Sequence, residues 1–600
     1  MLLPDFALRY LVTPKVYYEP FVTVIPCLFN LAWICLFLGI CLVLLPGKAG
    51  RLVFLIIGIM ANTLSFSDYV YFRIFGRFFW LSSVGLVGEA KNYFDYALSY
   101  TDAKIIVVTV ISLALLIAAF LKWKAPRRVK GRMRIMTAIP VLSLLILHVF
   151  MQPSVFGVLE DDWDSWSRPR VIYKQFTDIN KSFDVAGLYQ FVARDFWKTW
   201  FPTNNYGEED LKKADEYFAA RPEHTDNEYT GIFEGKNVIA VMMESMDNWM
   251  VTDESTPTIK YMMENGISFD RHFAPTIGTG YTFNTEFTFN TGFYTPKSAV
   301  TAVNFGDNSY PYALPRLFRE KGYLANSFHY NNSEFYNRGI MHTAFGYEQY
   351  NSFMKFGLTA YAAQADSNIL KNDEIYKKMT EGKPFFDFVI TYSCHIPYNY
   401  DDAKLSLARA NHPELVDPSM NEEKNNCLLL ARDTDDFFKQ LLERLDADGL
   451  LEDTVIIGFA DHYAYGFSDQ KLLEQYSREA GAELLRQVPA FIYNPQLKGV
   501  SVTKVTQTSD LLPTVLNLFG LENHGCYLGY DVFDPSYDGF AYFEDLSWYD
   551  GTTYYVPGQT ETSEAARGYT EQKNREVSEA VGINDIVIAG DYWGKHTKTP

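Results

Sequence analysis

Polar residues able to hold a metal ion directly follow two short apolar runs of the sequence. Glu244 comes after NVIAVMM (237–243), and the consecutive pair Asp461-His462 comes after TVIIGFA (454–460). Taken alone, a glutamate at such a position is more often a helix cap or a solvated side chain, and an isolated histidine is usually structural. Their joint placement after strands of one sheet favours a functional role over these readings.

A threonine with the position of a nucleophile stands further along the chain. Thr282 lies where a helix is expected to begin, after Gly278 and Gly280, which permit close backbone approach, and Glu286 follows one helical turn later. A hydroxyl at a helix N-terminus is commonly an N-cap. The same position receives a phosphate well, because free N–H groups and the helix dipole point toward it. A threonine hydroxyl becomes a good nucleophile only when a base or a metal ionises it.

Imidazoles and a guanidinium follow two further apolar runs. His395 comes after FFDFVIT (385–391), and His329 comes after LANSF (324–328) and opens a polar segment that ends at Arg338. In a parallel sheet the carboxyl ends of the strands meet at one edge, where ligands bind in α/β proteins. We therefore expect four strands to bring carboxylates, imidazoles and an arginine to a single edge.

The elements that must position these residues indicate an α/β domain over 236–600. Its apolar runs, which also include AFIY (490–493), alternate with helical stretches, of which the clearest is 421–445 with leucines and phenylalanines at a helical period. This alternation predicts a largely parallel sheet covered by helices.

The N-terminal part of the chain has the pattern of a membrane protein. Its uncharged apolar runs predict four transmembrane helices within 1–159, since a bilayer core needs about 20 apolar residues per helix. A cleaved signal peptide does not fit, because no small-residue cleavage site follows a short apolar stretch and further apolar runs come after the first. The expected helices are 21–45, 52–72, 104–121 and 135–157.

The loops between these helices predict their orientation. The loop 122–134 carries seven basic and no acidic residues, and such loops stay cytoplasmic, so the chain from 160 onward is expected outside the cell. The same alternation places the N-terminus outside, although nothing in 1–20 resembles an export signal, which suggests that an upstream helix is missing from this chain. Residues 160–235 are expected to be a linker with an amphipathic helix near 208–220.

The charge of the chain is divided in the same way. Residues 1–151 carry a net charge of +9 and the remaining residues a net charge of −28. Acidic surface argues against nucleic acid as a partner. Three of the six cysteines lie in the first span and three in the outer domain, without any C-x-x-C pair, so the outer domain has at most a single disulfide and must be held by its own core.

These strings together resemble the lipoteichoic acid synthase family over nearly the whole chain. The similarity lies in the N-terminal spans, the strand ending in ES, the G-x-T-x-x-x-E-F string at 280–287, the H-x-N-x5-NR string at 329–338, SCHIPY and ADHYAYG. Members of that family are membrane-anchored phosphoglycerol transferases with a sulfatase-like outer domain of the alkaline phosphatase superfamily. The resemblance implies metal ligands at Glu244, Thr282, Asp461 and His462, and this set of three oxygen donors and one imidazole suits Mn²⁺ or Mg²⁺ somewhat better than Zn²⁺, which stays as the alternative. It also implies the catalytic nucleophile at Thr282 and glycerophosphate-binding residues at His329, Asn331, Tyr336, Arg338 and His395.

The resemblance also implies a function and a location. The chain would be a multi-pass protein of the cell membrane with an extracellular catalytic domain. It would move glycerophosphate from phosphatidylglycerol or a related anionic lipid, through a threonine-bound intermediate, to a hydroxyl of a glycolipid or polymer acceptor. The chain departs from the family at Asn331, where many members carry Asp, at Tyr336, where they often carry Trp, and at Tyr281, which replaces a polar residue. These departures bear on which head group the chain binds and which acceptor it uses.

Several other functions stay open. A phosphoethanolamine or other head-group transferase could use the same threonine and metal, and a phosphodiesterase would pass the intermediate to water. A catalytically silent membrane scaffold would not bind the metal. Sulfate-ester hydrolysis is disfavoured, because no cysteine stands in the C-x-P-x-R string that a sulfatase needs.

Overall fold

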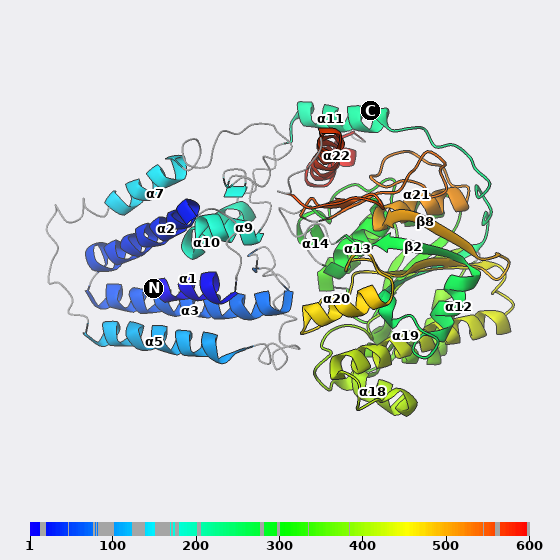
Figure 1. The fold of residues 1–600 in the computed structure, drawn as a ribbon, viewed down its shortest axis with the longest axis horizontal. Coiled ribbons are helices and arrows are strands. Elements are labelled where there is room, and N and C mark those ends of the chain that lie inside the picture. Colours follow the sequence, from blue (N-terminus) through cyan, green and yellow to red (C-terminus); the bar gives the residue numbers. More distant parts are fainter. Residues whose placement is uncertain are drawn as a thin grey trace. The chain divides into compact units, whose positions relative to one another are not determined.

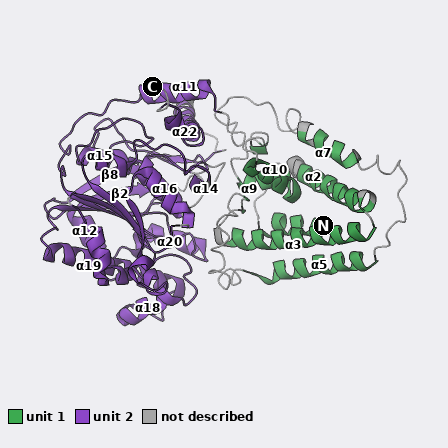
Figure 2. Ribbon diagram, turned by 180° about the vertical axis from the view of Figure 1, so that it is seen from behind, with its two compact units in different colours: residues 1–203 green, residues 204–600 purple. Residues whose placement is uncertain are grey.

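The computed structural model divides the chain into two compact units, residues 1–203 and 204–600 (Figure 2). Each unit is described here by itself. The residues described are 1–12, 20–45, 47–75, 78–79, 81, 101–122, 138–150, 169, 172–173, 179–200, 206–275, 281–296, 301–333, 335–382, 384–543, 545–557 and 564–596.

The first unit is helical (Figure 1). Three stretches in its helices are long and apolar enough to cross a membrane, at Val24–Leu42, Gly47–Arg73 and Ala103–Lys122, and they coincide with the first three predicted spans. The fourth predicted span contains α7, and its other residues lie outside the described part of the chain, as do residues 123–134 of the basic loop. The helices are α1 (Leu2–Ala7), η1 (Leu8–Val12), α2 (Pro20–Gly39), η2 (Ile40–Leu44), α3 (Gly47–Phe75), α5 (Ala103–Lys122), α7 (Ala138–Phe150), α9 (Ile179–Ala186) and α10 (Leu188–Trp200).

The segment that the sequence analysis treated as a linker is shared between the two units. Helices α9 and α10 pack in the first unit, where Phe183 and Phe191 join Phe29 of α2 in one buried cluster. A buried ion pair of 3.2 Å joins Arg9 to Asp184 in the same place. The amphipathic helix α11 (Glu208–Ala220) has the predicted bounds and lies in the second unit, where it contacts α22 (Glu564–Ala589).

The second unit is built on an eight-stranded mixed sheet in the order β4-β3-β5-β1-β6-β7-β2-β8. The strands from β4 to β6 are all parallel, β7 is antiparallel to both of its neighbours, and β2 is parallel to β8. The runs that predicted β1, β3, β5, β6 and β7 do form strands. The bounds are β1 (Asn237–Met243), β2 (Ile267–Phe273), β3 (Leu324–His329), β4 (Gln349–Ser352), β5 (Phe385–Ile390), β6 (Thr454–Ala460), β7 (Ala490–Tyr493) and β8 (Val500–Gln507).

Helices cover both faces of this sheet (Figure 1). Phe289 of α13 stacks on Phe459 of β6 on one face of the sheet. Phe438 of α19 contacts Phe491 of β7 on the other face. The faces are opposite because Phe491 pairs with Gly458, the neighbour of Phe459, and successive residues of a strand point to opposite faces. Buried on both faces, the central strands β1, β5 and β6 are apolar almost throughout.

Further helices belong to the second unit. They are α12 (Pro257–Asn265), α13 (Tyr281–Thr291), α14 (Thr301–Asn304), α15 (Leu314–Glu320), α16 (Arg338–Phe345), α17 (Asp373–Met379), α18 (Ala403–Asn411), α19 (Glu422–Ala447), α20 (Gln470–Glu479), α21 (Thr508–Leu518) and α23 (Tyr592–His596), in addition to α11 and α22. A small antiparallel sheet joins β9 (Ala541–Tyr542), β10 (Trp548–Tyr549) and β11 (Tyr554–Tyr555). All six cysteines are free thiols, so the single disulfide that the sequence left open is not formed in the structure.

Candidate functional site

The predicted site residues gather at the carboxyl edge of four neighbouring strands. Strands β3, β5, β1 and β6 lie next to one another and run parallel, so their C-terminal ends share one edge. His329 ends β3, Glu244 follows β1, Asp461 follows β6, and His395 lies in the loop after β5. The structure thus brings together side chains that are more than 200 residues apart in the sequence.

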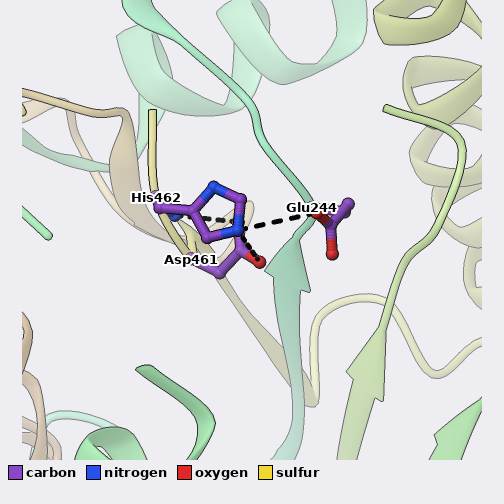
Figure 3. Close-up of side chains that lie close together, drawn as sticks. All are labelled: Glu244, Asp461 and His462. Atoms are coloured by element: carbon purple, nitrogen blue, oxygen red, sulfur yellow. Dashed lines mark hydrogen bonds and ion pairs between the residues drawn. The ribbon is translucent and has the colours of Figure 1, made fainter. Parts of the chain in front are cut away.

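Glu244, Asp461 and His462 form a compact cluster (Figure 3). One ligand atom from each side chain lies within 4.8 Å of the others, and all three residues are buried. His462 Nε2 lies 3.1 Å from Asp461 Oδ2 and 3.6 Å from Glu244 Oε1. His462 Nδ1 donates to the Tyr463 carbonyl at 3.0 Å, which leaves the Nε2 lone pair facing the carboxylates.

The electrostatics of this cluster fit a divalent cation. Burial raises the pKa of Glu244, and the nearby Asp461 carboxylate raises it further. Burial also raises the pKa of Asp461 to about 7 and lowers the pKa of His462. A divalent cation placed among the three side chains would favour ionised carboxylates and a neutral imidazole, and would therefore reverse these shifts.

The residue after Glu244 holds both carboxylates in place. The Ser245 N–H donates to Asp461 Oδ1 at 2.7 Å, and Ser245 Oγ donates to Glu244 Oε1 at 2.9 Å. Ser245 has a φ of 49°, in the left-handed region, which costs a residue other than glycine roughly 1–3 kcal/mol. The sequence analysis did not single out Ser245, because no residue type or spacing in the ES string signals a left-handed backbone.

The candidate nucleophile, Thr282, lies beside the cluster of Glu244, Asp461 and His462. Helix α13 begins at Tyr281, and Thr282 Oγ1 donates to Glu244 Oε2 at 3.3 Å. One turn later, Thr285 Oγ1 donates to the Asp461 main-chain carbonyl at 2.6 Å, which fixes the start of α13 to the end of β6. Gly278 and Gly280 lie outside the described residues.

Two predicted substrate-binding histidines face the same region. His329 Nδ1 donates to the Ile390 carbonyl at 2.9 Å, and Asn331 Nδ2 lies 3.4 Å from His329 Nε2. His395 Nδ1 donates to the Ile396 carbonyl at 2.7 Å. Burial lowers the pKa of both histidines, and for His329 the charge of Arg338 lowers it further. Both imidazoles are therefore neutral with Nε2 as the acceptor.

Aromatic rings connect the predicted residues into one site. Tyr392 stacks on His395 with ring centroids 4.8 Å apart and contacts His329 edge-on at 6.2 Å. Tyr336 stacks on Phe283, the residue after Thr282, at 5.6 Å. Aromatic rings therefore pack against His395, against His329 and against the residue that follows Thr282.

Arg338 is buried at the start of α16. Its side chain is 1% exposed, and Nη1 has no hydrogen-bond partner among the residues that the structure describes. The two residues before it, Tyr336 and Asn337, both have left-handed φ angles, of 50° and 52°. Strained backbone of this kind persists where the surroundings hold it, often at functional sites.

Two residues that contribute to this site carried no predicted role. Glu286 of α13 contacts Arg338, and His342 of α16 contacts Glu286. A signal was present in the spacing, because Glu286 follows Thr282, and His342 follows Arg338, by one helical turn, so that each pair shares a helix face.

The chain matches known protein families in both of its parts. The model of the lipoteichoic acid synthase N-terminal domain matches residues 9–205, and the sulfatase model matches residues 236–521. Lipoteichoic acid synthase 2 of Bacillus subtilis is 26% identical over 518 residues, which cover 81% of this chain and 74% of that protein. Lipoteichoic acid synthase of Staphylococcus aureus strain USA300 is 24% identical over 586 residues, covering 91% and 86% respectively.

A solved structure agrees with the fold of the second unit. The lipoteichoic acid synthase LtaP from Listeria monocytogenes has a TM-score of 0.53 and 20% sequence identity. The match covers 63% of this chain and 98% of that chain. The predicted sulfatase-like α/β fold is confirmed by this match and by the sulfatase family model.

Proposed function

Because this chain belongs to the lipoteichoic acid synthase family, we propose that it transfers glycerophosphate from phosphatidylglycerol to a hydroxyl acceptor in the synthesis of a lipoteichoic acid-type polymer. One observation carries the chemical part of the proposal. The Thr282 hydroxyl, at the beginning of a helix, lies 3.3 Å from Glu244 and thus directly beside the Glu244–Asp461–His462 cluster. This is the placement that an activated nucleophile needs.

The reaction is proposed to run in two steps through Thr282. In the first step a bond forms between Thr282 Oγ1 and phosphorus while the ester bond to diacylglycerol breaks, and the proton lost by Thr282 leaves with the diacylglycerol hydroxyl. In the second step an acceptor hydroxyl takes the glycerophosphoryl group and returns a proton to Thr282. The acceptor would be the headgroup of a glycolipid or the end of the growing polymer.

Glu244, Thr282, Asp461 and His462 would hold a metal ion, for which Mn²⁺ or Mg²⁺ is proposed and Zn²⁺ is the alternative. When bound, the ion lowers the pKa of the threonine hydroxyl and offsets the charge that develops on the phosphoryl oxygens. The cluster supports this proposal because two buried carboxylates face an imidazole lone pair.

The remaining site residues are proposed to bind the head group. Arg338 would bind phosphoryl oxygens through its terminal N–H groups, one of which is buried without a partner among the described residues. His329 and His395 are neutral, so their Nε2 atoms are suited to accept hydrogen bonds from the glycerol hydroxyls. Asn331 lies beside His329, and Tyr336 stacks on Phe283, the residue after Thr282, so both are proposed to contact the head group as well.

The location is proposed from the first unit. Its three apolar helices and the match to the lipoteichoic acid synthase N-terminal domain support a membrane-anchored protein. We place the catalytic unit outside the cell, because the loop 122–134 is strongly basic. A lipid donor gives a physical reason for the anchor.

The test is to trap the threonine-bound intermediate. Full-length protein in detergent is incubated with phosphatidylglycerol and Mn²⁺, digested, and examined by mass spectrometry for a glycerophosphoryl group on the peptide containing Thr282. A matched control is Thr288→Ala, which removes a buried hydroxyl from the same helix that donates only to the Asn284 carbonyl. The adduct is expected in the unmodified protein and in the control.

The alternative functions give different results in the same assay. Diacylglycerol released from phosphatidylethanolamine but not from phosphatidylglycerol would indicate a different head group. Free glycerophosphate formed at the full rate in the presence of a glycolipid acceptor would indicate a phosphodiesterase. An adduct on another residue would contradict the proposed nucleophile.

A further inference from the structure

Glu286 is a fully buried carboxylate that the proposed chemistry does not use. It lies on α13 one turn after Thr282, and its two oxygens reach two residues of α16. Oε2 accepts a hydrogen bond from Arg338 Nε at 2.9 Å, and Oε1 lies 2.5 Å from His342 Nε2. Arg338 and His342 are themselves one turn apart, so a single carboxylate of α13 links two residues of α16.

Both members of the buried Glu286–Arg338 pair are charged. Burial acts to raise the pKa of Glu286, but the charges of Arg338 and His342 outweigh it, and the pKa lies below its ordinary value. Burial acts to lower the pKa of Arg338, but Glu286 reverses this and the pKa lies above its ordinary value. Each charge compensates the other in a site closed to water, so loss of the contact would leave a buried charge without its partner.

Glu286 leaves part of the Arg338 guanidinium without a partner among the described residues. The carboxylate contacts Nε, whereas Nη1 is buried with no partner among the described residues. The rings of Tyr336 and Phe335 lie 5.2 Å and 5.4 Å from the Arg338 Cζ atom and restrict the guanidinium plane. An anion with two oxygens, such as a phosphoryl group, matches a guanidinium edge held in this manner.

The other end of the network is anchored to the sheet. A hydrogen bond of 2.7 Å joins His342 Nδ1 to Ser327 Oγ, and Ser327 lies in β3 two residues before His329. Glu286 is therefore fixed by β3 through His342, and it shares a helix with Thr282, whose hydroxyl contacts Glu244. One rigid helix thus sets the place of both the hydroxyl and the guanidinium.

We infer that Glu286 is a positioning residue, which holds the Arg338 guanidinium at a fixed place relative to Thr282 so that its terminal N–H groups face the phosphoryl group. This inference rests on the proposed function, in which Thr282 attacks phosphorus. It differs from a purely structural role for Glu286, because it requires the effect of Glu286 to pass through Arg338.

The test is a double-mutant cycle on the full-length protein with Glu286→Asp and Arg338→Ala. Aspartate keeps the charge but is one methylene shorter, so it is not expected to reach both Arg338 and His342. Glu286→Asp is expected to weaken the binding of inorganic phosphate in the presence of Mn²⁺, measured by calorimetry, about tenfold or more, while the affinity for Mn²⁺ alone stays the same. In the Arg338→Ala background the further loss caused by Glu286→Asp is expected to vanish.

A matched control is available in the same unit. Glu483→Asp shortens another glutamate that pairs with an arginine through Nε, since Arg271 Nε donates to Glu483 Oε2 at 2.9 Å, and phosphate binding should not change. If Glu286→Asp does not fold, Glu286→Gln, which keeps the length of the side chain and an acceptor for Arg338, is used in the same cycle with a smaller expected loss.

The outcomes separate this inference from the proposed function. Phosphate binding that is unchanged in Glu286→Asp, or a loss that persists in the Arg338→Ala background, would overturn the positioning role. Absence of phosphate binding in the unmodified protein would overturn it as well. Failure to release diacylglycerol from phosphatidylglycerol, with the phosphate cycle as expected, would count against the proposed function alone.

Discussion

The main-chain N–H of Ser245 donates to Asp461 Oδ1 at 2.7 Å, so a residue just after β1 orients a carboxylate that follows β6. The same residue donates its hydroxyl to Glu244 Oε1. Because Ser245 is held in a left-handed conformation, both hydrogen bonds depend on a backbone turn that few residues adopt. Two carboxylates from different strands are thereby kept at a distance that suits one cation.

The first prediction concerns the hydroxyl of Ser245. Ser245→Ala keeps the N–H that binds Asp461 but removes the hydrogen bond to Glu244, so the affinity for Mn²⁺ should fall about tenfold, as is typical when the partner of a metal ligand is lost. Calorimetry with Mn²⁺ measures this change. Ser268→Ala, on the exposed part of β2, serves as the control and should bind as the unmodified protein does. An unchanged affinity in Ser245→Ala would show that Glu244 needs no such support.

The second prediction concerns His462. His462→Ala removes the only imidazole of the cluster formed by the described residues and leaves two buried carboxylates close together, so bound Mn²⁺ and the thermal stabilisation by Mn²⁺ should both fall. Elemental analysis of the purified protein and melting curves with and without the ion measure these effects. His524→Ala, outside the cluster, is the control. Full metal content in His462→Ala would contradict the proposed ligand set.

The local sequence predicted the strands that carry the site, but it predicted few of the contacts that hold the site residues in place. The runs 237–243 and 454–460 are buried and apolar, and therefore predict strands directly. Strand β2 was not predicted, because Asp270 and Arg271 interrupt its apolar pattern near the edge of the sheet. In the site itself, residue types identified Glu244, Asp461 and His462, but the left-handed turn at Ser245 depends on contacts between strands.

Contacts between distant segments also hold the loop that carries His395. Asp366 accepts the N–H groups of Tyr392 and Ser393 at 2.8 and 3.1 Å, and Asp433 of α19 accepts the Ser393 hydroxyl at 2.5 Å. These two aspartates come from a short 3-10 helix and from α19, which are far apart in the sequence. No spacing rule connects them to the loop, so only the folded structure shows that they support it.

The third prediction uses this pair of aspartates and the pH. Burial raises the pKa of Asp366 to about 7, with a further contribution from Asp433, and burial raises the pKa of Asp433 as well. A carboxyl whose pKa is higher in the folded protein than in the unfolded chain destabilises the fold as the pH rises. The stability falls between the ordinary carboxyl pKa, near 4, and the folded-state pKa, because the unfolded chain releases its proton first. Removal of the Asp433 charge should therefore stabilise the protein at pH 8 and have little effect at low pH.

The variant for this test is Asp433→Asn, in which the amide oxygen keeps an acceptor for Ser393. The amide NH₂ group then takes the place of Oδ1, an atom that is buried without a partner among the described residues. The melting temperature of the variant relative to the unmodified protein should be higher at pH 8, and the difference should shrink toward pH 4. Asp446→Asn, at an exposed position of the same helix, is the control. A difference that is independent of pH would contradict the titration of this pair.

The fourth prediction distinguishes a nucleophile from a helix cap at Thr282. If Thr282 only caps α13, Thr282→Ala costs about 1 kcal/mol of stability and activity changes little beyond that. If Thr282 is the nucleophile, Thr282→Ala should abolish the release of diacylglycerol from phosphatidylglycerol while the protein still folds, because Glu244, Asp461 and His462 remain. Thr282→Ser should keep partial activity, since it retains the hydroxyl but loses the methyl group that restricts its rotamer.

The measurement for Thr282 is diacylglycerol release by the full-length protein in detergent with Mn²⁺, together with a melting curve for each variant. Thr288→Ala again provides the control, because it removes a hydroxyl from the same helix without touching Glu244. Loss of activity in Thr282→Ala with a melting temperature close to that of Thr288→Ala would assign the effect to chemistry rather than to folding. A folded Thr282→Ala protein that releases diacylglycerol at nearly the parent rate would refute the proposed mechanism, because the proposed covalent step takes place at that hydroxyl.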